Sequence, residues 1–276
     1  MADSTDSAAP AWTGAGQPQH QGAPEASGQF MSMLDQFDAN VRAPLHARLG
    51  MDARTQAILT LSMVAGQLQT QWIPAHVRQC VQAGLGRTEI GETLMHVYCY
   101  AGVYPSISGF KAAAQALDEL EAAGALTPEQ SAVRNEPPPT LTYEDRIAHG
   151  LQIRRELFGG KNITPLLEAA DAFDNLFNDM THDFCFGNIW ARPTFDWPLR
   201  SQLCLAIASA SGQIGAVERH TRSAVNNGVS QTRIAEIFLL AYVYGGAGNA
   251  MASFDMARSV FVAMAAEAAA ESGAAS

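Results

Sequence analysis

Two histidines with matching surroundings are the first candidates for chemistry in this sequence. His76 and His220 each precede a small residue by one helical turn, and each is followed eight residues later by a glycine, Gly84 or Gly228. Because histidine titrates near neutral pH, a helical histidine at the mouth of a pocket suits general acid–base catalysis. The structural alternative is a semi-buried histidine that bonds a backbone carbonyl. Its recurrence in two places keeps the catalytic interpretation open.

A second candidate group shares one face of a predicted helix. Glu92, His96 and Tyr100 are spaced i, i+4, i+8, so their side chains line up along that face. A carboxylate that orients a histidine beside a phenol would form a ladder for proton transfer. The structural alternative is a surface glutamate, a core histidine and an interfacial tyrosine. The corresponding stretch further along the chain keeps Tyr244 but has Leu240 in place of the histidine.

A proline-containing segment carries the best candidates for binding an anion. Trp190, Arg192 and Arg200 frame this predicted loop. The planar guanidinium of arginine can hold both oxygens of a carboxylate, which suits Arg192 to substrate binding. For Arg200 the structural alternative is packing at a helix start near Asp196.

Several other kinds of site are excluded by the residue pattern. The histidines and cysteines do not have the spacing of a metal site, and neither G-x-G-x-x-G nor a P-loop occurs. No nucleophile elbow supports a serine triad. The net charge of -10 without a basic cluster argues against binding nucleic acid. No apolar run is long enough to cross a membrane.

The cysteines indicate the compartment. The four cysteines form no C-x-x-C pair, and no signal peptide is recognisable. We therefore expect a reduced, cytoplasmic protein.

Hydrophobic periodicity predicts an all-α chain made of two similar halves. We expect a disordered tail at 1–28, a first repeat at 29–123, a proline-rich linker at 124–142, a second repeat at 143–268 and a frayed tail at 269–276. Within the second repeat, the pattern predicts one amphipathic helix over 163–180 and then a loop that begins near Asp183.

Constant offsets between the two halves indicate a duplication. The histidines, the glycines that follow them and the helix-ending Tyr100 and Tyr244 share one offset. Arg54 and Arg200 open the preceding helices at an offset two residues larger, so one two-residue indel lies before the histidine.

These motifs resemble the carboxymuconolactone decarboxylase family of the AhpD-like superfamily. The specific motifs lie in the second repeat: Phe186-Gly187, Trp190, Arg192-Pro193, Asp196, Arg200, His220, Asn226-Asn227-Gly228 and Tyr244. The first repeat has the looser pattern of Arg54, His76, Gly84, Glu92, His96 and Tyr100-Ala101-Gly102.

The resemblance implies an AhpD-like helical bundle, homo-oligomeric assembly and catalysis without a cofactor. The type reaction of the family removes CO2 from a carboxylated unsaturated lactone. It would use Arg192, or Arg200, to hold the carboxylate and His220 as the proton donor. Tyr244 and Arg54 stand at matching family positions. The cysteines of AhpD-like peroxidases are replaced by Gln213 and Ala216 before His220. Thiol peroxidase chemistry is therefore disfavoured.

The leading hypothesis is a lyase acting on a carboxylated unsaturated lactone or a polyketide-like small molecule. Four residues before the histidine, where such decarboxylases typically have glutamate, this chain has Trp72 or Ala216. That replacement motivates a second hypothesis of an isomerase, dehydratase or cyclase in the same pocket. A third is a non-catalytic oligomeric binding protein.

Overall fold

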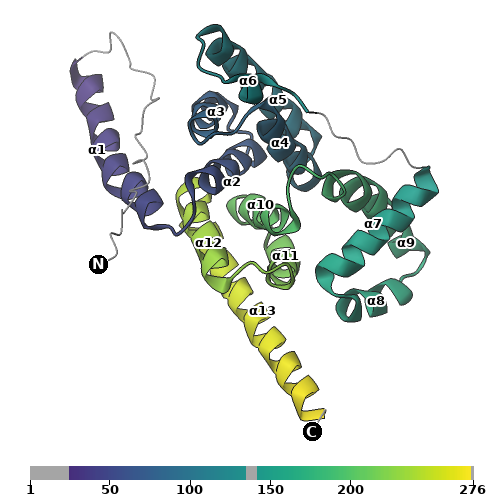
Figure 1. Cartoon of the computed structure of the whole chain (residues 1–276). Coiled ribbons are helices and arrows are strands. Elements are labelled where there is room, and N and C mark those ends of the chain that lie inside the picture. Colours follow the sequence, from purple (N-terminus) through teal and green to yellow (C-terminus); the bar gives the residue numbers. More distant parts are fainter. Residues whose placement is uncertain (1–24, 135–141, 275–276) are drawn as a thin grey trace, which may run out of the picture.

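The chain is a bundle of α-helices (Figure 1). The computed structural model describes residues 25–134 and 142–274, and these contain no β-strand. The all-α expectation is confirmed. The first half contains α1 (Glu25–Arg48), α2 (Ala53–Gly66), the one-turn 3-10 helix η1 (Thr70–Trp72), α3 (Ile73–Gln82), α4 (Arg87–Ala101), α5 (Val103–Ala122) and the short α6 (Pro128–Ser131).

The second half begins with two additional helices, α7 (Tyr143–Phe158) and α8 (Gly160–Glu168), and then repeats the order of the main helices of the first half. It continues with α9 (Ala172–Met180), the π-helix η2 (Thr181–Trp190), α10 (Trp197–Ala210), α11 (Ile214–Asn226), α12 (Gln231–Gly245) and α13 (Ala247–Ala274). The proline run of the expected linker and most of the expected tail at 1–28 lie outside the described residues.

The duplication is visible in the local structure that sets the ends of the helices. Asp52 and Asp196 are the N-caps of α2 and α10, and each side chain accepts a hydrogen bond from a backbone N–H three residues later. Gly84 and Gly228, which end α3 and α11, both have φ of +82°. Glycine suits this left-handed conformation because it has no Cβ. The duplicated order of helices therefore follows from duplicated caps and turns.

The two halves share one hydrophobic core. The central helices α2 and α10 contact each other and are buried along most of their length (Figure 1). Both consist almost entirely of apolar residues after the first turn, so every face of the helix must be covered. The main apolar cluster takes its members from both halves, from Leu49 to Ala257. The repeats are thus two parts of one packed body, and a site can form between them.

Two sequence expectations about the entry to the second half need correction. The single helix expected over 163–180 is divided into α8 and α9, because the Asp171 side chain caps a new helix by accepting from the N–H groups of Phe173 and Asp174. The loop expected from Asp183 is mostly the wide helix η2, and only Ala191–Asp196 is irregular. A π-helix is rare and often marks a functional site.

The wide helix η2 is held by an unusually close contact with α7. A Cβ at Gly150 of α7 would overlap the carbonyl oxygen of His182, and a Cβ at Gly187 of η2 would lie 2.7 Å from the carbonyl oxygen of Arg146. Both positions therefore require glycine for the helices to approach this closely. The salt bridge between Arg146 and Asp183 joins the same two helices at 2.6 Å.

Helix α1 projects from the body (Figure 1). It exposes large apolar side chains on one face. Phe30, Met33 and Phe37 are 71%, 70% and 66% exposed at helical spacing. Within the described residues, no helix is long and apolar enough to span a membrane.

Candidate active site between the two repeats

A buried carboxylate from the first repeat binds two arginines from the second. Glu92 of α4 is 3% exposed. Its Oε2 accepts from Nε of Arg192 at 2.8 Å, and its Oε1 accepts from Nη2 of Arg200 at 2.8 Å. The sequence-based ladder in which Glu92 orients His96 is therefore wrong about the partner of the carboxylate. Charge-assisted bonds at these distances are the strong kind, which explains how three charges are tolerated in the interior.

Arg200 holds the segment that carries Arg192. The side chain of Arg200 is fully buried at the start of α10. Its guanidinium also donates to the backbone carbonyls of Arg192 at 2.8 Å and of Phe195 at 3.2 Å. Burial lowers the pKa of Arg200, and the neighbouring Glu92 carboxylate opposes that shift. The Glu92–Arg200 contact thus positions the irregular segment and the more accessible Arg192.

Next to this cluster, Tyr100 lies between two histidines. The ring of His96 stacks on the Tyr100 ring at 5.0 Å between centroids, and His220 meets the same ring edge-on at 5.0 Å. The Tyr100 hydroxyl accepts a hydrogen bond from Nε1 of Trp190 at 2.9 Å. His96 Nε2 lies 3.2 Å from Sγ of Cys204. The structure therefore brings together His96 and Tyr100 of the predicted ladder, His220 of the histidine pair and Trp190 of the predicted anion-binding segment, which form three separate groups in the sequence.

Burial determines the protonation states of His96, Tyr100 and His220 near neutral pH. It lowers the pKa of His220 to about 3 and lowers the pKa of His96 well below its usual value. Burial also raises the pKa of the Tyr100 phenol well above 10. Both imidazoles are therefore neutral near pH 7, and the phenol keeps its proton. His220 Nδ1 has no hydrogen-bond partner among the described residues, which leaves a buried polar atom for a ligand to satisfy.

The other tyrosine of the duplication forms a related pair with the other histidine. Tyr244 of α12 meets His76 of α3 at 5.6 Å between ring centroids. The Tyr244 hydroxyl also lies 3.1 Å from Nε2 of His46. In each pair the tyrosine comes from one repeat and the histidine from the other. The backbone carbonyl of Tyr244 accepts from Gln67 at 3.0 Å.

The first pair has the equivalent contact, in which the carbonyl of Tyr100 accepts from Gln213 at 3.2 Å. The two pairs are thus related by the internal duplication.

The surroundings of the Tyr244 pair are different. Glu236, the counterpart of Glu92, accepts from the backbone N–H of Gly50 and pairs with Arg233. Arg54, the counterpart of Arg200, is 45% exposed and bonds Glu89 at 3.1 Å. The structure therefore does not place Arg54 beside Tyr244. The Tyr244 pair instead has the partly exposed Arg42, which pairs with Asp38, at its side. Of the two pairs, it is the Tyr100 pair that lies beside the buried Glu–Arg cluster.

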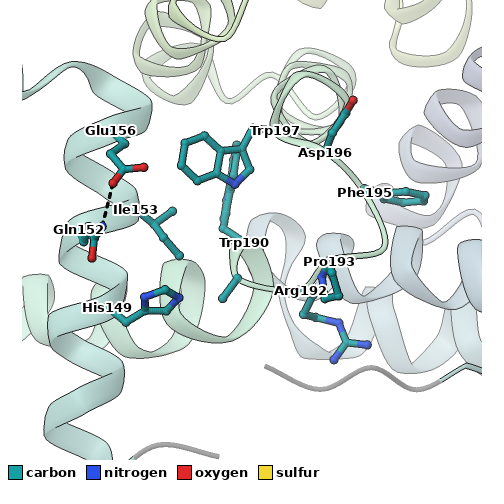
Figure 2. A pocket seen from close by; sticks show the side chains of 11 residues that line it. His149, Gln152, Ile153, Glu156, Trp190, Arg192, Pro193, Phe195, Asp196 and Trp197 are labelled. Carbon is teal, nitrogen blue, oxygen red and sulfur yellow. Dashed lines mark hydrogen bonds between the residues drawn. The ribbon is translucent and has the colours of Figure 1, made fainter. Parts of the chain in front are cut away.

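Two cavities adjoin Arg192. The smaller, about 460 Å³, lies between α7 and the segment from Trp190 to Trp197. Figure 2 shows His149, Gln152 and Glu156 of α7 facing Trp190 across it. The larger, about 820 Å³, is bounded by α4, α5 and η2 and includes Glu92 and Arg192 in its lining. Trp190 separates the smaller cavity from Tyr100, because the indole lines that cavity and bonds the phenol.

Comparison with known proteins agrees with the duplicated architecture. The sequence model of the carboxymuconolactone decarboxylase family matches twice, at residues 28–119 and 176–259. These two segments cover well over half of the chain. The chain belongs to this family.

Two relatives illustrate the likeness of this carboxymuconolactone decarboxylase family member to characterised proteins. A 4-carboxymuconolactone decarboxylase from Acinetobacter baylyi is 31% identical over 121 residues, which cover 44% of this chain and 90% of the relative. A nitrosuccinic acid decarboxylase from Metarhizium robertsii is 31% identical over 97 residues, which cover 35% of this chain and 68% of the relative. Helices α7 and α8 fall between the two family segments.

Several residues near the site of this family member were missed by sequence reasoning. Cys204 contacts His96, and Cys185 lies 3.7 Å from the Tyr100 hydroxyl, but nothing in their spacing pointed to either contact. Gln67 and Gln213 did carry a signal, because they recur at the same larger offset as the arginine pair. Among the described residues, no group of three or more His, Cys, Asp or Glu side chains could hold a metal ion.

Proposed function

We propose that this chain is a decarboxylase-type lyase that acts without a cofactor on a carboxylated, conjugated small molecule. The observation that carries the proposal is the buried Glu92–Arg192–Arg200 cluster beside a protonated tyrosine that lies between two histidines. The names of the two relatives, both decarboxylases, support the same reaction class. An unsaturated lactone or a polyketide-like acid has the conjugated carbonyl that this chemistry requires.

In this proposal Arg192 binds the carboxylate of the substrate. Its side chain is 11% exposed and lines both cavities, whereas that of Arg200 is fully buried. Glu92 and Arg200 act as positioning residues, because they hold Arg192 and its backbone in place. A guanidinium held in advance costs little reorganisation when the substrate binds.

The proton is delivered by the group around Tyr100. Loss of CO2 leaves an electron pair that the conjugated carbonyl of the substrate accepts as a dienolate. Tyr100 lines neither cavity, so in this proposal the Trp190 indole moves aside and the phenol then donates a proton to carbon. The sum is R–CO2⁻ + H⁺ → R–H + CO2. Once the indole returns, its N–H stabilises the phenolate, since it donates to the same oxygen in this structure. The phenolate then regains its proton through a water molecule that joins its oxygen to neutral His220, whose ring meets the Tyr100 ring edge-on.

The decisive experiment measures CO2 release and product mass from purified protein with conjugated carboxylic acids and carboxylated lactones. We expect a product lighter by CO2, and we expect His220→Ala to remove the activity. His76→Ala is the matched control, because the Tyr244 pair lacks the buried arginine cluster. Equal loss in both variants would mean that both pairs take part in catalysis. No release of CO2 from any such acid would refute the proposal.

A second candidate function keeps the same pocket and transfers protons without losing CO2. It is favoured by Trp72 and Ala216, which stand where family decarboxylases typically have glutamate four residues before the histidine. An isomerase or cyclase gives a product of unchanged mass, and a dehydratase gives one lighter by water. A non-catalytic binding protein would give no product at all while still binding the acid.

Assembly and compartment are also proposals. The exposed apolar face of α1, with Phe30, Met33 and Phe37, would be covered in a homo-oligomer. Light scattering after size-exclusion chromatography tests this, and a purely monomeric protein would contradict it. All four cysteines are free thiols, which fits a reducing compartment such as the cytoplasm.

A further inference from the structure

The larger cavity beside Arg192 is an apolar groove that crosses the boundary between the repeats. Its walls come from α4 and α5 of the first repeat and from η2 of the second. Leu94, Met95, Tyr98, Phe110 and Phe184 supply much of its surface. The rings of Tyr98 and Phe184 meet across the boundary at 5.3 Å between centroids. A volume of about 820 Å³ lies within the range of pockets that bind ligands of drug size.

The charged residues of the groove favour an anion. Arg87, Arg134 and Arg192 line it, and Glu92 is its single carboxylate among the described residues. Arg87 is already paired with Asp118 and Glu121 outside the groove, so Arg192 and Arg134, which is 4.0 Å from Glu89, are the cations that favour an anion. Glu92 is itself neutralised by a second cation, Arg200, which lies outside the groove. Arg134 is 65% exposed at the rim. An apolar ligand with one negative charge therefore matches both the walls and the charged residues.

Helix α4 connects this groove to the site of chemistry. Gly91, Met95 and Tyr98 form one stripe of the helix and line the groove. Glu92, His96 and Tyr100 form the adjacent stripe, which faces η2 and α10. Arg192 stands where the two stripes meet, because it lines the groove and bonds Glu92.

We infer that the groove between α4, α5 and η2 binds the apolar body of the substrate, and that the substrate is an amphiphilic monocarboxylic acid whose carboxylate lies at Arg192. This inference rests on the proposed function for the reaction and adds the class of substrate. A small dicarboxylic acid would leave most of the apolar groove in contact with water. A hydrocarbon chain or fused ring would cover it, at a gain of about 25 cal/mol for each Å² of apolar surface buried.

Calorimetric titration of the whole chain with three probes tests the inference without relying on turnover. The probes are octanoate, its neutral counterpart octanamide, and succinate as a small polar dicarboxylate. We expect octanoate to bind at least tenfold more tightly than either of the others. We also expect a negative heat-capacity change on binding, because apolar surface is buried. Succinate binding as tightly as octanoate would overturn the inference.

Two pairs of variants locate the binding. Ala114 lines the groove from the exposed side of α5, so Ala114→Trp should fill the groove without disturbing the core and weaken octanoate binding at least tenfold. Gln115→Trp is the matched control at the next exposed position, outside the groove. Arg134→Gln should reduce the preference for octanoate over octanamide, whereas Arg155→Gln, which removes an exposed charge elsewhere, should not. Unchanged binding in Ala114→Trp would overturn the inference.

The outcomes separate this inference from the proposed function. If octanoate does not bind but a small polar acid loses CO2, the inference about the groove is wrong and the proposed function stands. If octanoate binds as expected but no acid loses CO2, the proposed function is wrong and the class of ligand stands. If Ala114→Trp instead changes the mass measured by light scattering and octanoate gives no heat, a second copy of the chain covers the groove, and the inference is overturned.

Discussion

Replacing Glu92 by glutamine tests whether the carboxylate holds the two halves of the site together. Glutamine keeps the shape of the side chain and removes the negative charge that Arg192 and Arg200 share at 2.8 Å. The Glu92 side chain is 2% exposed and that of Arg200 is fully buried, so water cannot take over the lost contacts. Removing one partner of a buried ion pair typically costs about 3–5 kcal/mol.

The assay is thermal and urea unfolding of the purified variant. In a chain of this size each kcal/mol lowers Tm by about 2–4 °C, so a loss of about 3–5 kcal/mol should lower Tm by about 6–20 °C. Glu267→Gln is the control, because this glutamate pairs with Arg222 at the surface and its loss should leave Tm unchanged.

A second variant, in which Glu92 and Arg200 are both replaced by methionine, should recover part of the lost stability, since the fully buried charge of Arg200 is removed together with its carboxylate partner. The loss of the Glu92 contact to Arg192, whose side chain is 11% exposed, remains. A Glu92→Gln protein whose Tm falls by less than about 2 °C, which corresponds to less than about 1 kcal/mol, would refute the reasoning.

Three further predictions concern the tyrosine, the buried histidines and the packing of η2. Tyr100→Phe should lower kcat by about 10²-fold or more with little change in Tm, because it removes the proton donor but keeps the ring. Steady-state kinetics and calorimetry measure the two quantities, and an unchanged kcat would contradict the prediction. Burial lowers the pKa of His220 to about 3 and that of His76 to about 4, below the ordinary 6.5. Below pH 6.5 the unfolded chain therefore binds more protons than the folded one. The free energy of unfolding should fall as the pH decreases from about 6.5 towards 4. Urea unfolding at pH 7.5 and pH 5 measures this fall, which His220→Phe should reduce. Gly150→Ala should destabilise the protein by about 1–3 kcal/mol, because the added methyl group meets the carbonyl of His182; an unchanged unfolding midpoint would mean that α7 moves away without cost.

Much of the helical order could be derived from the sequence because helices are defined locally. The helix predicted from Arg54 lies within α2, and the glycines after Phe158 end α7, where Gly159 has φ of +75°. The predicted helix boundaries are wrong where a side-chain hydrogen bond or a change of helix type was not foreseen. The carboxylate of Asp171 starts a new helix inside the predicted one, and η2 keeps a helical path through residues that suggested a loop.

The candidate site could be derived only in part. Helical spacing correctly placed Glu92, His96 and Tyr100 on one face of α4, but it predicted His96 as the hydrogen-bond partner of Glu92. The carboxylate bonds arginines that lie 100 and 108 residues away in the chain, and no local pattern encodes that distance.

The sequence by itself determined the helices, the duplication and the membership of the family, because caps, turn glycines and apolar periodicity act over a few residues. Tertiary structure alone decided that each tyrosine meets the histidine of the other repeat. It also decided that the buried Glu92–Arg200 pair lies beside Tyr100, whereas the partly exposed Arg42–Asp38 pair lies beside Tyr244. The physical reason is that α2 and α10 bury all their faces against each other and their neighbours, and this packing brings α4 of one repeat onto α10 and η2 of the other.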